Sequence, residues 1–276
     1  MISTIRSRAV KNYKVTSPSL RSVVFDIDNG HLKLPSFQRS WCWGDNDVRK
    51  LIASIAAGDP IGSFTFTHAG PIGNRSLASA EKTAEQSEAV QLILDGQQRL
   101  TAAYQALCRP TPVRIEATLP PEYRLYFFDM ETAVAHPDSV ETAIISITTR
   151  PDGVPVSDSN AQYAESFYQY ERGLFPTNLI FDPRAYQRGF SEFWQAEVQS
   201  SSRRQAFRVL DDFRDLVVER FATYLLPVLT LDSQITADET LRIFKKLNAR
   251  AHPHPRRCEP ASRATGAGCR AECARS

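Results

Sequence analysis

A strand passes directly into a helix within the segment Leu94-Asp95-Gly96-Gln97-Gln98-Arg99-Leu100-Thr101, and this junction restricts the possible folds most strongly. Residues 91–94 read as a short buried strand. After Gly96 the apolar positions recur at helical spacing, at Leu100, Ala103, Tyr104 and Leu107. Pro110 lies beyond the end of this helix. Because Gly96 lets the chain turn sharply, the backbone at the junction can approach a ligand closely.

The first turn of this helix has the chemistry of an anion site. Its N–H groups have no partner within the helix and attract negative charge. Gln97, Gln98 and Arg99 place amide donors and a planar guanidinium at that end, which suits contact with phosphate. Asp95 could ligate a divalent cation, since Mg²⁺ usually takes one or two carboxylates together with phosphate oxygens. The structural alternative is that Asp95 caps the helix and Arg99 pairs with a surface carboxylate.

A second polar pair lies among aromatic residues in the segment Pro35–Trp43. Gln38 and Arg39 follow the end of an expected strand, and Arg39 could complete a phosphate clamp. Trp41 and Trp43 could stack on a base, but each is more commonly a core or interface anchor. The sequence alone leaves both a ligand role and a structural role open for Gln38 and Arg39.

A third segment, Phe244–Asn248, belongs to the last helix that the sequence predicts. This helix begins at the capping sequence Thr236-Ala237-Asp238-Glu239. Lys245 and Lys246 are expected to face solvent. Asn248 is of a residue type that often ends a helix, so its simplest role is structural.

The rest of the chain mixes strand and helix patterns. Strands are expected at residues 22–27, 32–34, 61–67, 123–128, 144–147 and 224–231. Pro227 indicates an edge or bulged position for the last of these. A helix capped by Asp45 or Asn46 buries Val48, Leu51, Ile52 and Ile55 and ends at Gly58, and further helices are expected at 162–170 and over much of 184–223.

The sum of these elements is an α+β body of about 250 residues with a helical lobe from about residue 160 onward. Residues 69–89 are rich in Gly, Ser, Ala and Glu, and we expect a mobile insertion there. The chain has no Gly-x-x-x-x-Gly-Lys-Ser/Thr loop and no Gly-x-Gly-x-x-Gly fingerprint. His31, His68 and His136 are dispersed, and no His-Asn-His nuclease motif is readable.

Composition changes abruptly at Ala251. Residues 251–276 contain no Val, Ile, Leu, Phe, Tyr or Trp, so we predict that this tail is disordered. Its five Arg and two Glu give the tail a formal charge of +3. The whole chain has a charge of +2, so the first 250 residues together carry −1. Their net charge therefore gives no reason to expect DNA binding. A zinc site is the weaker interpretation, because the spacing of the candidate ligands is not compact: His252, His254, Cys258, Cys269 and Cys273. We interpret the tail as translation in a wrong reading frame, which predicts a truncation or a sequencing error.

The sequence also indicates the compartment. The N-terminus lacks the apolar stretch of a secretory signal, and no segment approaches the ~20 consecutive apolar residues of a membrane span. Cys42 and Cys108 are the cysteines outside the tail, and two scattered thiols fit a reducing environment. We therefore expect a soluble, cytoplasmic protein.

Four motifs, in order along the chain, resemble the N-terminal domain of GmrSD-type restriction endonucleases. They are Pro35–Trp43, Leu51–Ile55 with Gly58–Gly62, Asp95–Thr101 and Phe244–Asn248. The Asp-Gly-Gln-Gln-Arg box is the most specific of them. The resemblance spans about residues 30 to 250, so we expect a domain over residues 1–250, with a core at about 30–110 and a helical and mixed lobe at about 120–250.

The resemblance implies a ParB/sulfiredoxin-like mixed sheet with helices, and a domain that binds and hydrolyses nucleoside triphosphates to license DNA cleavage. Cleavage itself would belong to a nuclease domain of His-Asn-His type, directed at modified, often glucosylated, cytosine in phage DNA. Carried over to this chain, the nucleotide site would comprise Asp95, Gly96, Gln97, Gln98 and Arg99, with Gln38 and Arg39 beside it. Among these, we expect Asp95, Gln97 and Arg99 to be the catalytic residues, with Asp95 also holding the metal.

These expectations combine into one leading hypothesis and two alternatives. The leading hypothesis is an NTPase subunit or fragment of a phage-restriction system, dependent on Mg²⁺ or another divalent cation, with DNA, a separate nuclease and further copies of itself as partners. Arg99 and Arg39 would neutralise developing charge, and a metal on Asp95 would bridge phosphates. The alternatives are a nucleotide-sensing DNA-binding regulator without turnover, and an inactive fragment that departs from the family pattern after Ala251.

Overall fold

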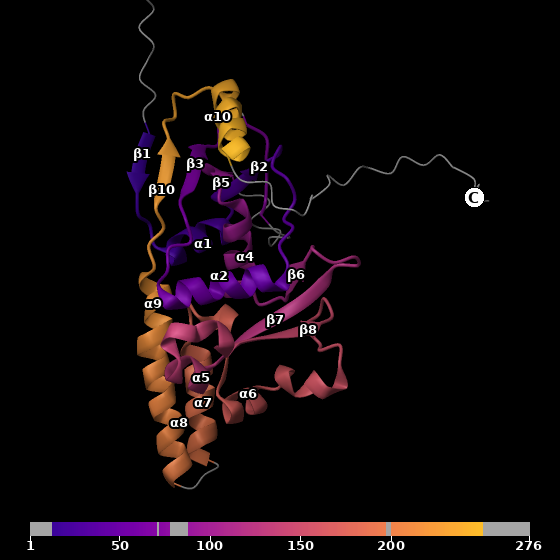
Figure 1. Cartoon of the computed structure of the whole chain (residues 1–276), viewed down its shortest axis with the longest axis vertical. Helices are drawn as coiled ribbons and strands as arrows, with labels where there is room; N and C mark the ends of the chain where they lie inside the picture. The colour runs from indigo at the N-terminus through magenta and orange to yellow at the C-terminus, as the bar shows by residue number, and fades with distance from the viewer. Residues whose placement is uncertain (1–12, 71, 78–87, 197–199, 251–276) are drawn as a thin grey trace, which may run out of the picture.

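The computed structural model describes residues 13–70, 72–77, 88–196 and 200–250. A six-stranded mixed sheet with its helices forms the upper part in Figure 1, a smaller antiparallel sheet lies beside it, and a hairpin of long helices extends below. The expected α+β class, followed by a helical region, is confirmed. The predictions for residues 251–276, and most of the expected insertion at 69–89, lie outside the described residues.

The large sheet combines strands from both ends of the chain. Its order is β1 (Tyr13–Thr16), β10 (Val228–Leu231), β3 (Phe64–His68), β5 (Gln91–Asp95), β2 (Leu32–Pro35) and β4 (Asn74–Arg75). β10 is parallel to β3 and β2 is parallel to β5, whereas the other neighbours are antiparallel. The edge position predicted for the segment 224–231 was wrong, because β10 lies between β1 and β3. Pro227 precedes the strand, so its missing N–H leaves no gap in the hydrogen bonds of the sheet. Its carbonyl accepts a hydrogen bond from the Phe64 N–H at 2.9 Å.

Residues 20–28 form helix α1 (Leu20–Asp28), so the strand predicted at 22–27 was wrong. The hydroxyl of Ser19 caps this helix by accepting a hydrogen bond from the Ser22 N–H at 3.1 Å. Helical spacing then buries one face, composed of Leu20, Val23, Val24 and Ile27. The cap and this burial outweigh the strand propensity of the β-branched residues, since such propensity depends strongly on context.

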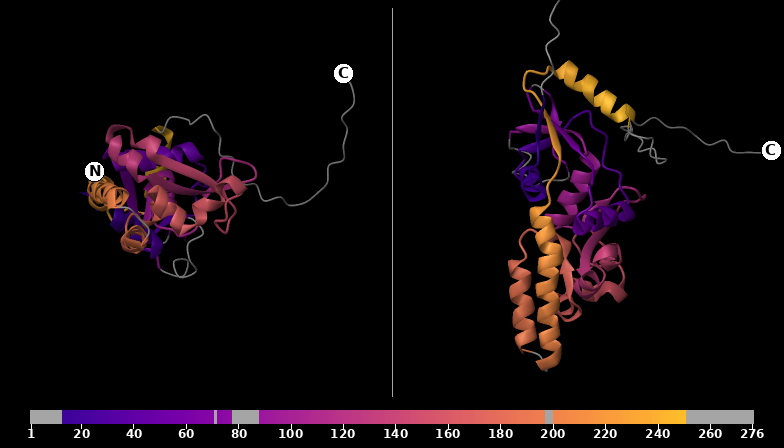
Figure 2. Two further views of the ribbon diagram at one scale, coloured as in Figure 1. Left: turned by 90° about the horizontal axis from the view of Figure 1, so that it is seen from below. Right: turned by 60° about the vertical axis from the view of Figure 1, so that its left-hand side comes forward.

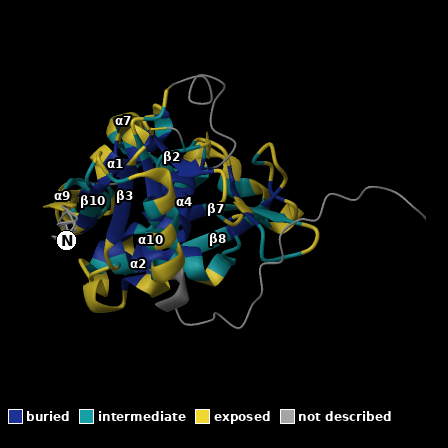
Figure 3. Cartoon of the chain, turned by 90° about the horizontal axis from the view of Figure 1, so that it is seen from above, coloured by how far each residue is buried: buried dark blue, intermediate teal, exposed yellow. Residues whose placement is uncertain are grey.

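Two helices predicted from their apolar stripes are confirmed. In α2 (Asp45–Ala57) the predicted stripe is buried, and Gly58 ends the helix with φ 82°. The N-cap of α2 is Gly44, one residue before Asp45 and two before Asn46, the two expected caps. Helix α4 (Gln97–Leu107) follows β5 and is buried on nearly all sides, packing against both α1 and α2. Seen from above in Figure 3, the strand β3 and the helix α4 are mainly buried, while α10 (Ala237–Arg250) presents exposed residues.

The smaller sheet consists of β6 (Val113–Ile115), β7 (Glu122–Asp129) and β8 (Ile144–Thr149), with β9 (Leu174–Pro176) pairing with β7. The strands predicted at 123–128 and 144–147 are therefore confirmed. The helices around it are α5 (Met130–Ala135), α6 (Ser166–Arg172), α7 (Arg184–Ala196), α8 (Ser200–Phe213) and α9 (Glu219–Thr223), with 3-10 turns at Pro137–Ala143, Asp158–Ala164 and Thr177–Leu179.

The helix expected at 162–170 is divided, because Glu165 adopts an extended conformation between the second 3-10 turn and α6. A π-helical turn, Arg214–Val218, joins α8 to α9, and α7 and α8 lie side by side in the right-hand view of Figure 2. No helix in the described ranges is both long enough and apolar enough to cross a membrane.

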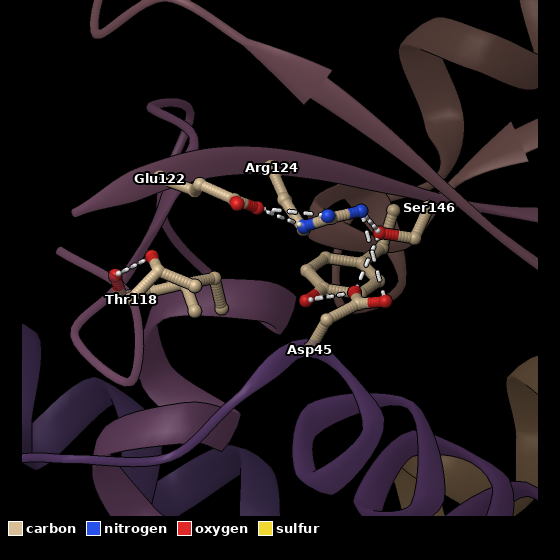
Figure 4. Close-up of polar contacts among 7 residues, drawn as sticks. Asp45, Thr118, Glu122, Arg124 and Ser146 are labelled. Atoms are coloured by element: carbon tan, nitrogen blue, oxygen red, sulfur yellow. Dashed lines mark hydrogen bonds and ion pairs between the residues drawn. The ribbon is translucent and has the colours of Figure 1, made fainter. Parts of the chain in front are cut away.

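A polar network joins α2 to the smaller sheet (Figure 4). The carboxylate of Asp45 accepts hydrogen bonds from the hydroxyls of Ser146, at 2.6 Å, and Tyr126, at 2.9 Å. The Arg124 guanidinium lies 3.7 Å from the same carboxylate and 2.8 Å from that of Glu122. The network fixes the first turn of α2 against β7 and β8.

Candidate functional site

The turn between β5 and α4 admits only glycine. Gly96 has φ 90°, and a Cβ placed on it would lie 2.2 Å from the ring of Phe64. No side chain in the described residues caps α4, so the first N–H groups of the helix keep their capacity to bind an anion. The alternative that Asp95 caps this helix was wrong, because Gly96 occupies the N-cap position.

The two glutamines that begin α4 are buried and hold a neighbouring segment. Gln97 is 5% exposed, and its side-chain amide donates to the carbonyl of Arg39 at 2.7 Å. The Gln98 amide donates to the carbonyl of Ser40 at 3.2 Å and accepts from the N–H of Cys42 at 2.9 Å. Through these contacts Gln97 and Gln98 hold the segment 39–42 beside the helix start.

The side chain of Gln38 is also hydrogen-bonded to backbone carbonyls. Its amide donates to the carbonyls of Ile93, at 3.1 Å, and Leu94, at 3.0 Å, which ties the segment to the end of β5. The structure thus brings Gln38, Gln97 and Gln98 together. The exposed side chain of Arg39 makes no hydrogen bond or ion pair with any described residue, but its backbone carbonyl accepts a hydrogen bond from Gln97.

Two further residues complete the support of this segment. The indole N–H of Trp41 donates to the carbonyl of Gln98 at 3.3 Å, and the ring is 7% exposed, which agrees with the interpretation of Trp41 as an anchor. Arg75 donates to the carbonyls of Gln38 and Arg39 at 3.2 and 3.0 Å. Sequence reasoning missed Arg75, because it lies in the stretch interpreted as a mobile insertion and no motif marks it.

Arg99 reaches across the site to the loop before β3. Its guanidinium donates to the carbonyls of Ile61 and, at 3.1 Å, Ser63, and lies over the ring of Phe64 at 4.6 Å from the centroid. The carboxylate of Asp95 is 3.8 Å away. Burial lowers the pKa of Arg99, and the neighbouring Asp95 opposes that shift. In this state Arg99 anchors the loop 61–63 to α4.

The third predicted segment packs on the second. The ring of Phe244 in α10 meets the ring of Phe37 with centroids 4.8 Å apart, and α10 also contacts β5. The predicted cap of α10 is confirmed, since the N–H of Glu239 donates to the Thr236 hydroxyl at 3.3 Å. The helix continues past Asn248 to Arg250, so Asn248 does not end it. All three motif segments therefore meet around the β5–α4 junction.

The three segments that meet at this junction lie within a single family match. The family model of the GmrSD restriction endonuclease N-terminal domain matches residues 20–253. The chain belongs to this family. This membership confirms the resemblance drawn from the motifs and places the GmrSD domain among the components of restriction systems.

One curated relative of this GmrSD domain is an uncharacterized protein of Methanocaldococcus jannaschii, which is 26% identical over 193 residues. The match covers 65% of this chain and 32% of the relative, so the aligned part spans about a third of that protein's own length.

The GmrSD domain offers one carboxylate for a metal at the helix start. The Asp95 side chain is 45% exposed at the end of β5, and its 3.8 Å contact with Arg99 is too long for a tight ion pair. Within the described ranges no group of three or more His, Cys, Asp or Glu gathers to hold a metal. A single carboxylate fits Mg²⁺ that arrives with phosphate oxygens, since Mg²⁺ keeps several waters and needs few protein ligands.

Proposed function

We propose that this GmrSD domain binds and hydrolyses nucleoside triphosphates at the start of α4. The observation that supports it most directly is the uncapped first turn of α4 after Gly96, flanked by the Asp95 carboxylate and the Arg99 guanidinium. Unpaired N–H groups and the helix dipole favour negative charge at this end. The phosphate chain lies across this turn.

In this proposal the side chains divide into ligand groups and positioning groups. Asp95 would hold Mg²⁺ together with the phosphates, and the ion would neutralise phosphate charge. Arg99 now donates to two neutral carbonyls, Ile61 and Ser63. A phosphate oxygen is a stronger acceptor than either, so Arg99 transfers donors to the phosphate when nucleotide binds. Gln97 fixes the backbone of Arg39, and the exposed guanidinium of Arg39 then reaches the negative charge of the phosphates.

The wider role in this proposal is the one that the family resemblance suggests. Nucleotide hydrolysis by this domain licenses DNA cleavage by a nuclease domain or subunit of His-Asn-His type, in defence against phage DNA. Because the first 250 residues have a formal charge of −1, DNA contact depends on a local basic surface rather than on bulk charge.

Phosphate release from ATP and GTP in the presence of Mg²⁺ tests the proposal. We expect Asp95→Asn and Arg99→Gln to reduce the hydrolysis rate by about 100-fold, the scale of losing one preorganised group that stabilises transition-state charge. Arg208→Gln, an exposed arginine on α8, is the matched control and keeps the wild-type rate. Hydrolysis that is unchanged in both site variants would remove the α4 start from the mechanism.

One observation favours a second function, a nucleotide-sensing regulator without turnover. The donors of Arg99, Gln97 and Gln98 are already bound to backbone carbonyls. A domain in which those contacts persist would bind nucleotide through the helix start without acting on it. Calorimetric binding of a non-hydrolysable triphosphate together with no phosphate release from ATP or GTP would support this function against the first.

A further inference from the structure

A cavity of about 420 Å³ lies along α4, away from Asp95 and Arg99. Thr101 and Gln105, one helical turn apart, line it from α4. At ~100° per residue, Thr101 is about 200° around the helix from Arg99, so the two side chains point to opposite sides. The cavity is therefore distinct from the proposed triphosphate site, although Ser40 and Trp41 form part of its wall.

Thr101 supplies an unused polar group to this cavity. The residue is 0% exposed, and its hydroxyl has no hydrogen-bond partner among the described residues. A buried hydroxyl without a partner costs free energy that most proteins avoid. Because solvent does not reach the hydroxyl, a ligand in the cavity would satisfy it after a small shift of the neighbouring side chains.

The charged groups of the lining favour an anion. The lining contains three arginines and one carboxylate: Arg75, Arg109, Arg114 and Glu116. Glu116 pairs with Arg114 at 3.2 Å, while Arg109 forms no ion pair with any described residue. Arg75 is held in place by the carbonyls of the segment 38–39 through one nitrogen, and its other donors make no hydrogen bond within the described chain. Burial lowers the pKa of Arg75, which an anion beside it would oppose.

The remaining wall fits an organic group. Trp41 and Tyr123 contribute aromatic surface, and Leu77 and Pro112 are apolar. Drug-sized and cofactor-sized ligands occupy cavities of roughly 300–1,000 Å³, so this volume suits a molecule the size of a mononucleotide. We propose that this cavity binds a small organic phosphate of mononucleotide size. Arg75 and Arg109 hold its phosphate, and Thr101 donates to or accepts from its organic part.

Isothermal titration calorimetry with GMP, AMP and inorganic phosphate tests this second site. We expect at least one of these probes to bind the wild-type chain. Arg109→Gln should weaken the affinity for that probe about tenfold or more, as expected for the loss of a charged hydrogen bond. Thr101→Val should weaken it about fivefold, as expected for a neutral one. Arg208→Gln should bind as the wild type does. Arg114→Gln, at a half-exposed position of β6, provides a third variant if Thr101→Val or Arg109→Gln impairs folding, and it should also weaken binding.

Arg99→Gln separates the two sites. If the cavity is the site, this variant binds the monophosphate as tightly as the wild type, whatever its effect on triphosphate hydrolysis. Loss of binding in Arg99→Gln with no effect of Arg109→Gln would place the ligand at the α4 start and overturn the proposal. Absence of binding by all three probes would also overturn it, as would tighter binding of a single-stranded oligonucleotide than of either mononucleotide.

Discussion

The carboxylate of Asp45 accepts a 2.9 Å hydrogen bond from the hydroxyl of Tyr126, which fastens the first turn of α2 to the central strand of the smaller sheet. Ser146 donates to the same carboxylate, and Arg124 lies beside it. Because α2 also packs on α4, this network connects the smaller sheet to the helix that begins the candidate site.

Tyr126→Phe is expected to lower the free energy of unfolding by about 1–2 kcal/mol, since it removes one hydrogen bond to a charged group and leaves the rest of the ring in place. Urea unfolding followed by circular dichroism measures the change. Tyr186→Phe is the matched control: Tyr186 is 3% exposed, and its hydroxyl has no partner among the described residues. We expect this control to be neutral or stabilising, and an equal loss in both variants would contradict the role of the network.

Alkaline pH provides a separate test on Tyr186. Burial, together with Tyr170, raises the pKa of Tyr186 above the value of about 10 that it has in the unfolded chain. The folded state therefore favours the protonated phenol, so this contribution is complete below pH ~10 and is lost as pH rises above it, by up to about 1.4 kcal/mol per pH unit. Tyr186→Phe should flatten the fall in unfolding free energy between pH 10 and pH 11. An unchanged slope would show that Tyr186 is not responsible.

Gly96→Ala should destabilise the fold far more than Gly58→Ala. Both glycines have positive φ, of 90° and 82°, so both substitutions carry the ~1–2 kcal/mol cost of a left-handed conformation. A Cβ at Gly96 also meets the ring of Phe64 at 2.2 Å, whereas a Cβ at Gly58 meets nothing within 4 Å. We expect an additional loss of about 1–3 kcal/mol at Gly96 from overpacking. Thermal melts of the two variants compare them directly, and similar melting temperatures would refute the close approach.

Local patterns predicted most of the helices around the site but not α1. The stripe of α2 and the capping box of α10 are read within one or two turns of chain, and both appear in the structure. In α1 the same kind of pattern was present at Leu20, Val23, Val24 and Ile27, yet the β-branched residues favoured a strand. Burial of that face against α4 and α9 decides the outcome, and such contacts are not visible in the sequence.

The strand–turn–helix junction at Gly96 was predicted, but the contacts of its side chains were not. Gly96 and the helix start follow from neighbouring residues, so the junction could be located. The partners of Gln97 and Gln98 lie in the segment 39–42, far away in sequence, and only the fold reveals that both amides bind backbone there. Arg75 had no signal, because one arginine on a two-residue strand resembles any surface residue.

Arg99→Lys separates the geometry of the guanidinium from its charge. Lysine keeps the positive charge but presents one compact ammonium, which cannot donate to the carbonyls of Ile61 and Ser63 in the forked arrangement of arginine. We expect a loss of about 1–2 kcal/mol in unfolding free energy and a fall of at least about tenfold in triphosphate hydrolysis. Arg242→Lys is the control, because Arg242 is half-exposed and lies 3.9 Å from its partner Glu239. Full hydrolysis by Arg99→Lys would mean that charge alone suffices at this position. A fall in hydrolysis without a loss of stability would assign the guanidinium to the nucleotide rather than to the loop 61–63.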